Sequence, residues 1–126
     1  MSFVATTRNI TVTVMPIYLA LKSNFFEKKF SFAYFVGITN DGVGSVQLLR
    51  RRWMIVDSNE KIKIVEGDGV VGKQPFISPG ETYTYNSFCV IETLSGFMEG
   101  SYTMLSSDGE EFEVMIPKFF LNANSN

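Results

Sequence analysis

The chain has 126 residues, of which 45% are hydrophobic, and a formal net charge of -2. A chain of this length forms one domain that buries roughly two-thirds of the surface of its unfolded form, so folding requires no disulfide or metal. The small acidic excess disfavours a nucleic-acid-binding surface, which needs concentrated Lys and Arg. Histidine is absent, which excludes Ser-His and Cys-His nucleophile pairs and the usual zinc sites.

The N-terminal segment and the hydrophobic runs bear on cellular location. Residues 1–9 contain no apolar core of the kind found in signal peptides. No apolar run approaches the roughly 18 residues that a membrane-spanning helix requires. The single cysteine, Cys89, has no partner for an internal disulfide. We therefore expect a cytoplasmic protein with no cofactor and with no membrane or nucleic-acid partner.

Short runs of β-branched and aromatic residues alternate with turn signals, which is typical of an all-β antiparallel sandwich rather than of alternating strands and helices. We predict strands at residues 10–18, 30–39, 46–57, 61–65, 82–90, 98–105 and 112–116. The expected turns include Asn40-Asp41-Gly42, Asp57-Ser58-Asn59-Glu60, Pro79-Gly80 and Asp108-Gly109. The whole chain, residues 1–126, is expected to be one domain.

Three further expectations concern particular places along the chain. The strand at 10–18 contains Pro16, which cannot donate a ladder hydrogen bond, so we predict that this strand lies at a sheet edge. Trp53, the only tryptophan, is expected at the centre of the core on one face with Leu49 and Ile55. Residues 19–29 form a long polar and aromatic connection. Residues 122–126 are expected to be disordered, which leaves an ordered part of roughly 3–121.

Residues 66–75 contain the spacing G-x-G-x-x-G at Gly67, Gly69 and Gly72. In a dinucleotide site a helix begins at the third glycine, but here Lys73 and then a proline follow, so no useful helix can start. The favoured interpretation is structural, because glycines permit positive φ in a tight connection. In the alternative, successive backbone N–H groups and Lys73 bind an anion weakly, against the charge of Asp68.

The basic run Arg50-Arg51-Arg52 has the same two interpretations. Alternate strand residues face opposite sides, so Arg50 and Arg52 are expected on a solvated face, and this is favoured over phosphate binding. In the alternative interpretation, in which the loop binds a polyphosphate, the candidate ligands are Gly67, Asp68, Gly69, Gly72, Lys73 and Arg51. No catalytic residue set or metal site is expected, because the carboxylates do not cluster at ligand spacing. Cys89 alternates with tyrosines on an apolar face and is expected to be buried.

Many spaced motifs carry a resemblance to a known family. They are Val46-Gln47-Leu48-Leu49 with Arg51 and Trp53, the segment Gly67 to Gly72 with Gln74-Pro75, Ser78-Pro79-Gly80-Glu81 with Tyr85 and Ser87, the set Gly96, Met98, Gly100 and Tyr102, and Phe112-Glu113-Val114 with Ile116-Pro117 and Phe119. Over residues 8–121 the chain resembles the ApaG family. The resemblance implies an immunoglobulin- or fibronectin-III-like β-sandwich. Two positions depart from it: Arg52 replaces a common histidine, and Phe97 replaces a small residue.

What the resemblance implies about activity is limited. Bacterial members are named for gene neighbourhood with a diadenosine-tetraphosphate hydrolase and for a link to cobalt and magnesium resistance. Eukaryotic relatives carry the domain inside F-box and DNA-polymerase-associated proteins, where it resembles an interaction module. We therefore predict a non-enzymatic protein-interaction module, a monomer or weak homodimer, that uses loops or an exposed strand edge. The alternative is a weak pyrophosphate or nucleoside-polyphosphate binding protein linked to divalent-metal homeostasis; a hydrolase is least favoured.

Overall fold

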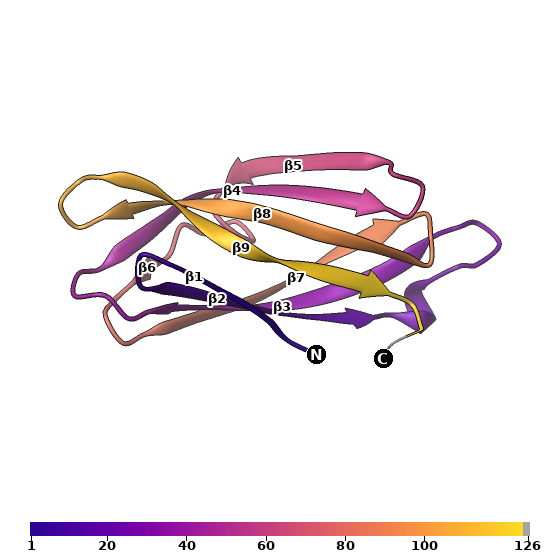
Figure 1. Cartoon of the computed structure of the whole chain (residues 1–126), viewed down its shortest axis with the longest axis horizontal. Coiled ribbons are helices and arrows are strands. Elements are labelled where there is room, and N and C mark those ends of the chain that lie inside the picture. The colour runs from indigo at the N-terminus through magenta and orange to yellow at the C-terminus, as the bar shows by residue number, and fades with distance from the viewer. Residues whose placement is uncertain (125–126) are drawn as a thin grey trace.

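The computed structural model describes residues 1–124, and within them two antiparallel sheets pack face to face (Figure 1). The elements are β1 (Phe3–Thr7), β2 (Ile10–Tyr18), the short 3-10 helix η1 (Ala20–Lys22), β3 (Phe30–Asn40), β4 (Val46–Asp57), β5 (Ile62–Asp68), β6 (Phe76–Ile77), β7 (Thr82–Ile91), β8 (Ser95–Ser106) and β9 (Glu111–Asn122). One sheet has the order β1-β2-β3-β7; the other has the order β5-β4-β8-β9, with β6 also paired to β4. The predicted all-β sandwich is confirmed. In the described part of the chain, no helix is long and apolar enough to cross a membrane.

The edge of the first sheet differs from the sequence prediction. Strand β1 pairs with β2 from Phe3 opposite Val14 to Thr7 opposite Ile10, while β3 lies on the other side of β2. The prediction that residues 10–18 form an edge strand was therefore wrong. Pro16 lies beyond Val14, the last residue that β1 reaches. Among residues 1–124, β3 is therefore the one strand that pairs with β2 at this point, with Tyr34 opposite Pro16. The missing N–H is tolerated there.

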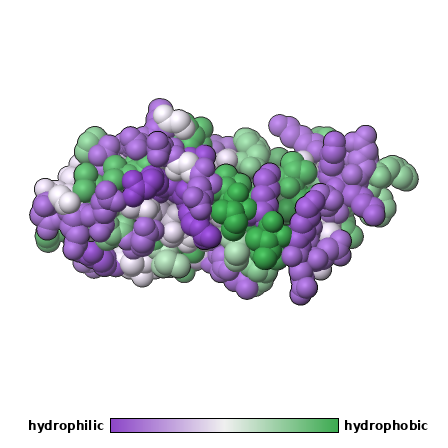
Figure 2. Space-filling model, turned by 90° about the horizontal axis from the view of Figure 1, so that it is seen from above, coloured by the Kyte–Doolittle hydropathy of each residue, from purple (hydrophilic) through white to green (hydrophobic). Residues whose placement is uncertain are grey.

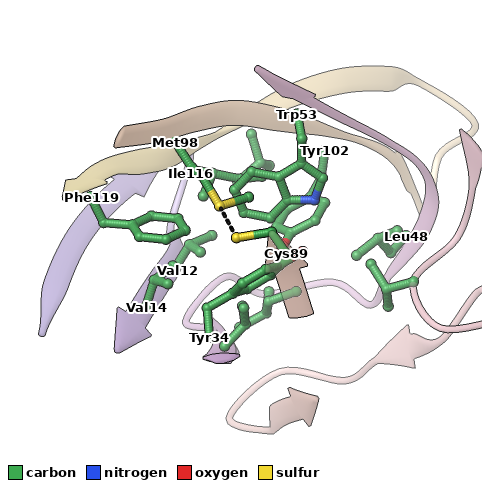
Figure 3. Close-up of a cluster of buried hydrophobic side chains, with 14 of the residues drawn as sticks. Val12, Val14, Tyr34, Leu48, Trp53, Cys89, Met98, Tyr102, Ile116 and Phe119 are labelled. Carbon is green, nitrogen blue, oxygen red and sulfur yellow. Dashed lines mark hydrogen bonds between the residues drawn. The ribbon is translucent and has the colours of Figure 1, made fainter. Parts of the chain in front are cut away.

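The core between the sheets is centred on aromatic rings, as expected for Trp53 (Figure 3). Trp53 is buried, with its ring 5.3 Å from that of Tyr34 and 5.8 Å from that of Phe119. The predicted burial of the only tryptophan is thus confirmed. Because these rings come from both sheets, they hold the two layers in a fixed relation.

A β-bulge in β4 changes which side chains share the face of Trp53. The register against β8 shifts between Leu48 and Arg50, so Leu49 is the extra residue. Leu48 is fully buried and Leu49 is not, which corrects the expected grouping of Leu49 with Trp53. After the bulge, Arg51 has the same inward orientation as Trp53, since alternate residues share a face.

The C-terminal end is more ordered than expected. Strand β9 continues to Asn122, Ala123 N donates to Leu94 O at 2.8 Å, and Asn124 N donates to Asn122 Oδ1 at 2.9 Å. These contacts replace the expected disorder at residues 122–124. The remaining two residues of that expectation, 125 and 126, lie outside the described residues.

Candidate functional site at the glycine loop and the β7 edge

The glycine loop, residues 67–73, ends in a tight hairpin tip. Val70 N donates to Lys73 O at 2.8 Å, and Lys73 N donates to Val70 O at 3.0 Å. Between them, Val71 and Gly72 have φ values of 48° and 77°. Positive φ at both central residues is the geometry of a type I′ turn. The buried Val70 side chain fixes this turn to the core.

Gly69 occupies a position that no other residue fits. Its φ is +63°, and an added Cβ would lie 2.1 Å from Lys73 O, a backbone atom that cannot move aside cheaply. Gly69 N donates to Leu49 O at 2.8 Å, and Gln74 Nε2 donates to the same oxygen at 2.9 Å. The bulge at Leu49 thus supplies the carbonyl that anchors the loop to β4.

Arg51 is the second anchor of the loop. Its Nη1 donates to Asp68 O and to Gly69 O, each at 3.0 Å. A Cβ added to Gly67 would lie 2.9 Å from the same Nη1, so the absence of a side chain at Gly67 makes room for the guanidinium. The positive charge therefore faces backbone carbonyls of the loop. A guanidinium held this way stabilises the loop rather than standing free for an anion.

The structure brings four of the six predicted ligands together and separates two. Arg51, Gly67, Asp68 and Gly69 meet at the base of the loop, whereas Gly72 and Lys73 belong to its exposed tip. An anion nest needs free N–H groups, but those of Gly69 and Lys73 already bond within the protein, as does that of Val70. These hydrogen bonds favour the structural interpretation of the glycines.

The other two arginines of the basic run lie on the solvated face, as predicted. Arg50 Nη2 is 2.7 Å from Glu111 Oε1, and Arg52 Nε is 3.2 Å from Glu66 Oε1, with all four side chains exposed. They line a groove of about 380 Å³ that also includes three of the predicted ligands, Arg51, Gly67 and Asp68. Figure 2, which looks down on the molecule from this side, shows hydrophilic and hydrophobic residues intermixed. The paired carboxylates remove most of the local positive charge.

Three tyrosines of the core, Tyr34, Tyr85 and Tyr102, interact electrostatically with Arg51. The Tyr85 and Tyr102 hydroxyls are hydrogen-bonded to each other, and the Tyr34 hydroxyl bonds to Ser87. Burial raises the pKa of both Tyr85 and Tyr102 well above the ordinary tyrosine value. The two phenols are therefore neutral at physiological pH, and their hydrogen bond joins β7 and β8 across the core.

Cys89 is buried, as the sequence predicted. Its Sγ lies 3.6 Å from Met98 Sδ, toward which it donates (Figure 3). Burial raises the pKa of the Cys89 thiol to about 12, so the group is a thiol and not a thiolate at neutral pH. Across residues 1–124, no three His, Cys, Asp or Glu side chains gather as a group that could hold a metal ion.

Strand β7 presents a feature that the sequence analysis did not single out. Within residues 1–124, its ten residues pair with β3 on one side and with no strand on the other, and none of the ten is charged or proline. The other edge strands have features that disfavour pairing with a further strand. Strand β9 contains Pro117 and Lys118 and receives a contact from β1, because Met115 N donates to Thr7 Oγ1 at 3.2 Å. Strand β5 contains Lys63 and Glu66, and β1 has only five residues.

The outward side of β7 is also apolar near its end. Phe88 and Val90 are 58% and 53% exposed, and Lys22 Nζ lies 5.6 Å from the centre of the Phe88 ring. A long, uncharged edge with exposed apolar side chains is a recognised site of strand addition. The uncharged run from Thr82 to Ile91 is visible in the sequence. Whether this run lies at an exposed edge depends on which strands pair.

Comparison with known proteins agrees with this architecture. The family model for the ApaG domain matches residues 21–106. The chain belongs to the ApaG family. It is 49% identical over 118 residues to Protein ApaG of Methylobacterium sp. (strain 4-46), with 94% of this chain and 91% of that protein covered. It is 48% identical over 117 residues to Protein ApaG of Rhodospirillum centenum, with 93% and 90% covered.

Solved structures of similar proteins have the same fold. A crystal structure of the putative ApaA protein from Bordetella pertussis superimposes with a TM-score of 0.89 at 40% identity, covering 93% of this chain and 95% of that one. An X-ray structure from a structural genomics consortium gives a TM-score of 0.88 at 38% identity, covering 93% and 89%. The family resemblance seen in the sequence motifs is thus confirmed.

Proposed function

We propose that this ApaG-family protein is a binding module that recognises a protein partner by strand addition at the edge of β7. The observation that carries the proposal is a ten-residue strand that has no charged side chain and, in the described part of the chain, one neighbouring strand. Backbone N–H and C=O groups along such an edge match those of an extended partner segment. The module requires no catalytic group.

The side chains of β7 supply specificity in this proposal. An added strand places alternate side chains beside Phe88 and Val90 on the outer face of the sheet. Apolar or aromatic residues in the partner would bury this surface, and main-chain hydrogen bonds would fix its register. Two copies can pair through the same edge, so we propose a monomer that forms at most a weak homodimer.

Binding rather than catalysis is supported by the state of the candidate reactive groups. The only thiol, that of Cys89, has a pKa raised to about 12 by burial and is protonated at neutral pH. The hydroxyls of Tyr85 and Tyr102 are neutral at the same pH, because burial raises the pKa of each. The guanidinium of Arg51 is engaged with the carbonyls of Asp68 and Gly69. Each of these groups has a structural task in the fold.

The alternative proposal, weak polyphosphate binding at residues 67–73, has less support. Three backbone N–H groups that it would use, those of Gly69, Val70 and Lys73, are bonded within the protein. What favours it is the exposed side chain of Lys73. A titration with pyrophosphate, with and without Mg²⁺, followed by NMR of the loop amides, tests it. A saturable shift confined to this loop would support the alternative over a purely structural loop.

Affinity capture with matched variants tests the β7 proposal. The tagged protein is compared with Val90→Lys, which places a charge beside the free edge, and with Val4→Lys, the same change at an exposed position on the opposite edge of the sheet. We expect a partner that is retained by the wild-type protein and Val4→Lys and lost by Val90→Lys. Capture that is equal for the two variants would contradict the use of β7.

A further inference from the structure

The connection between β2 and β3, residues 19–29, protrudes from one end of the sandwich (Figure 1). Three large apolar side chains on it face solvent: Leu21 is 102% exposed, Phe26 96% and Phe25 67%. Figure 2 shows hydrophobic residues at the extremity of this end, next to hydrophilic ones. Side chains this exposed form a convex tip rather than a groove. Such clustering marks an interaction site, since single exposed apolar residues are normally scattered.

The tip is held in a defined conformation. Asn24 and Lys29 exchange backbone hydrogen bonds of 2.8 and 3.0 Å, and Lys28 N donates to Phe25 O at 3.1 Å. Asn24 Oδ1 also accepts from Glu27 N at 3.1 Å. Because the backbone is fixed in this way, Phe25 and its neighbour Phe26 are presented outward together, with ring centres 6.2 Å apart. The exposure is therefore built into the loop.

The charge of the tip is opposite to that of the whole protein. Residues 19–29 contain Lys22, Lys28 and Lys29 but only one acid, Glu27, which leaves a charge of +2 in a chain of net charge -2. Within residues 1–124, Glu27 pairs with Lys29 at 3.6 Å, and neither Lys28 nor Lys22, which lies against the Phe88 ring, has a carboxylate partner. Beside the tip lies a groove of about 270 Å³ in which Phe25, Phe30 and Leu94 are apolar, Lys28 is basic, and Asn59, Thr93 and Glu92 are polar or acidic. The carboxylate of Glu92 is paired with Lys61 at 2.7 Å.

We propose that this tip binds the surface of anionic lipid membranes. Aromatic and leucine side chains on a convex support enter the boundary between headgroups and acyl chains, while surrounding lysines contact anionic headgroups. A rigid protein pocket would have to match the tip in shape, whereas a bilayer adapts to it. The proposal departs from the sequence expectation of no membrane partner. That expectation was based on the lack of a spanning segment, and a peripheral contact needs none.

Binding to vesicles tests the proposal with matched variants. We expect the full-length protein to co-sediment with vesicles of phosphatidylcholine and phosphatidylglycerol, more weakly as salt rises, and to remain in the supernatant with phosphatidylcholine alone. Phe26→Ser should lower the partition coefficient by about tenfold or more, because one large apolar side chain is lost from the interface. The control is Phe76→Ser, an equally drastic change at a 71% exposed phenylalanine on β6.

Depth of insertion provides the second measurement. In Phe26→Trp, the new indole should shift its emission to the blue on anionic vesicles and be quenched by lipids brominated near the headgroup. The wild-type protein is its own control, because Trp53 is buried in the core. No co-sedimentation with anionic vesicles at low salt would overturn the proposal and leave a protein pocket as the target of the tip. Equal losses for Phe26→Ser and Phe76→Ser would also overturn it.

Discussion

The guanidinium of Arg51 lies over Gly67 at a distance that leaves no room for a side chain there. A Cβ at Gly67 would stand 2.9 Å from Nη1, the same atom that donates to the carbonyls of Asp68 and Gly69. The pair explains why an arginine on the inner face and a glycine on the neighbouring strand occur together. It also makes the glycine loop a structural unit whose parts can be tested separately.

The Arg51–Gly67 pair should behave as a coupled pair in a double-mutant cycle. Arg51→Ala removes two hydrogen bonds to loop carbonyls and should lower the free energy of unfolding by about 1–3 kcal/mol. Gly67→Ala should destabilise the wild-type protein by pressing on the guanidinium, but less so in the Arg51→Ala background. Urea unfolding of the four proteins gives the coupling. Additive effects would show that the two residues do not constrain each other.

Gly69 and Gly72 offer a comparison between two glycines with positive φ. Gly69→Ala should lower the free energy of unfolding by more than about 2 kcal/mol, because the added Cβ meets Lys73 O at 2.1 Å in addition to the strain at φ +63°. Gly72→Ala has nothing within 4 Å of its Cβ at φ +77°. It should therefore cost only about 1 kcal/mol for the backbone conformation. Thermal or chemical unfolding measures the loss of stability in each variant. Equal losses would show that the Cβ of Gly69→Ala does not clash with Lys73 O.

Trp53→Ala should destabilise the protein by about 3–5 kcal/mol, because the large buried ring is lost and a cavity remains. Its contacts with Tyr34 and Phe119 join side chains from both sheets. Since Trp53 is the only tryptophan, unfolding is followed by far-ultraviolet circular dichroism rather than by fluorescence. A denaturant midpoint close to that of the wild-type protein would show that the ring does not hold the layers together.

The burial of Cys89 predicts a dependence of stability on alkaline pH. The folded protein keeps the proton up to about pH 12, whereas the unfolded chain releases it near the ordinary value of 9.0. The unfolded state therefore binds fewer protons between these values, and stability is complete below pH 9 and falls as the pH rises toward 12. At pH 10 the Cys89 contribution to this loss is about 1.4 kcal/mol.

Cys89→Ala isolates this contribution from that of the buried tyrosines. The decrease in unfolding free energy between pH 8 and pH 10 should be smaller in the variant than in the wild-type protein, whatever the variant's stability at pH 8. Denaturant unfolding at the two pH values gives both decreases. If they are equal, the thiol titrates in the folded state as it does in the unfolded state.

The sequence was sufficient to predict local structure but not strand neighbours. Alternating residues located seven strands and placed Trp53 in the core, since periodicity and hydrophobicity act locally. Strand β1 was not predicted, because Val4 points outward and the five-residue segment has little alternation of polarity. Pro16 was then assigned to an edge that β1 in fact occupies.

The candidate sites show the same limit. The inward orientation of Arg51 depends on the bulge at Leu49, which appears only when β4 is aligned with β8. The position of β7 at the end of its sheet depends on the order of the strands, which is a long-range property. Similarly, the exposure of Phe26 follows from the folded loop and not from its sequence. In each case the sequence shows the residue types, whereas their neighbours and their exposure to solvent are defined only by the folded structure.

Amide hydrogen exchange of β7 tests the central proposal most directly. The partner retained in the capture experiment is added to the purified protein, and exchange is followed along Thr82 to Ile91 and along the remaining edge strands. We predict that amides of β7 become protected on binding while those of β5 and β1 do not change, because the added strand hydrogen-bonds to the free side of β7. Protection confined to another edge or to the loops, with β7 unchanged, would contradict the account.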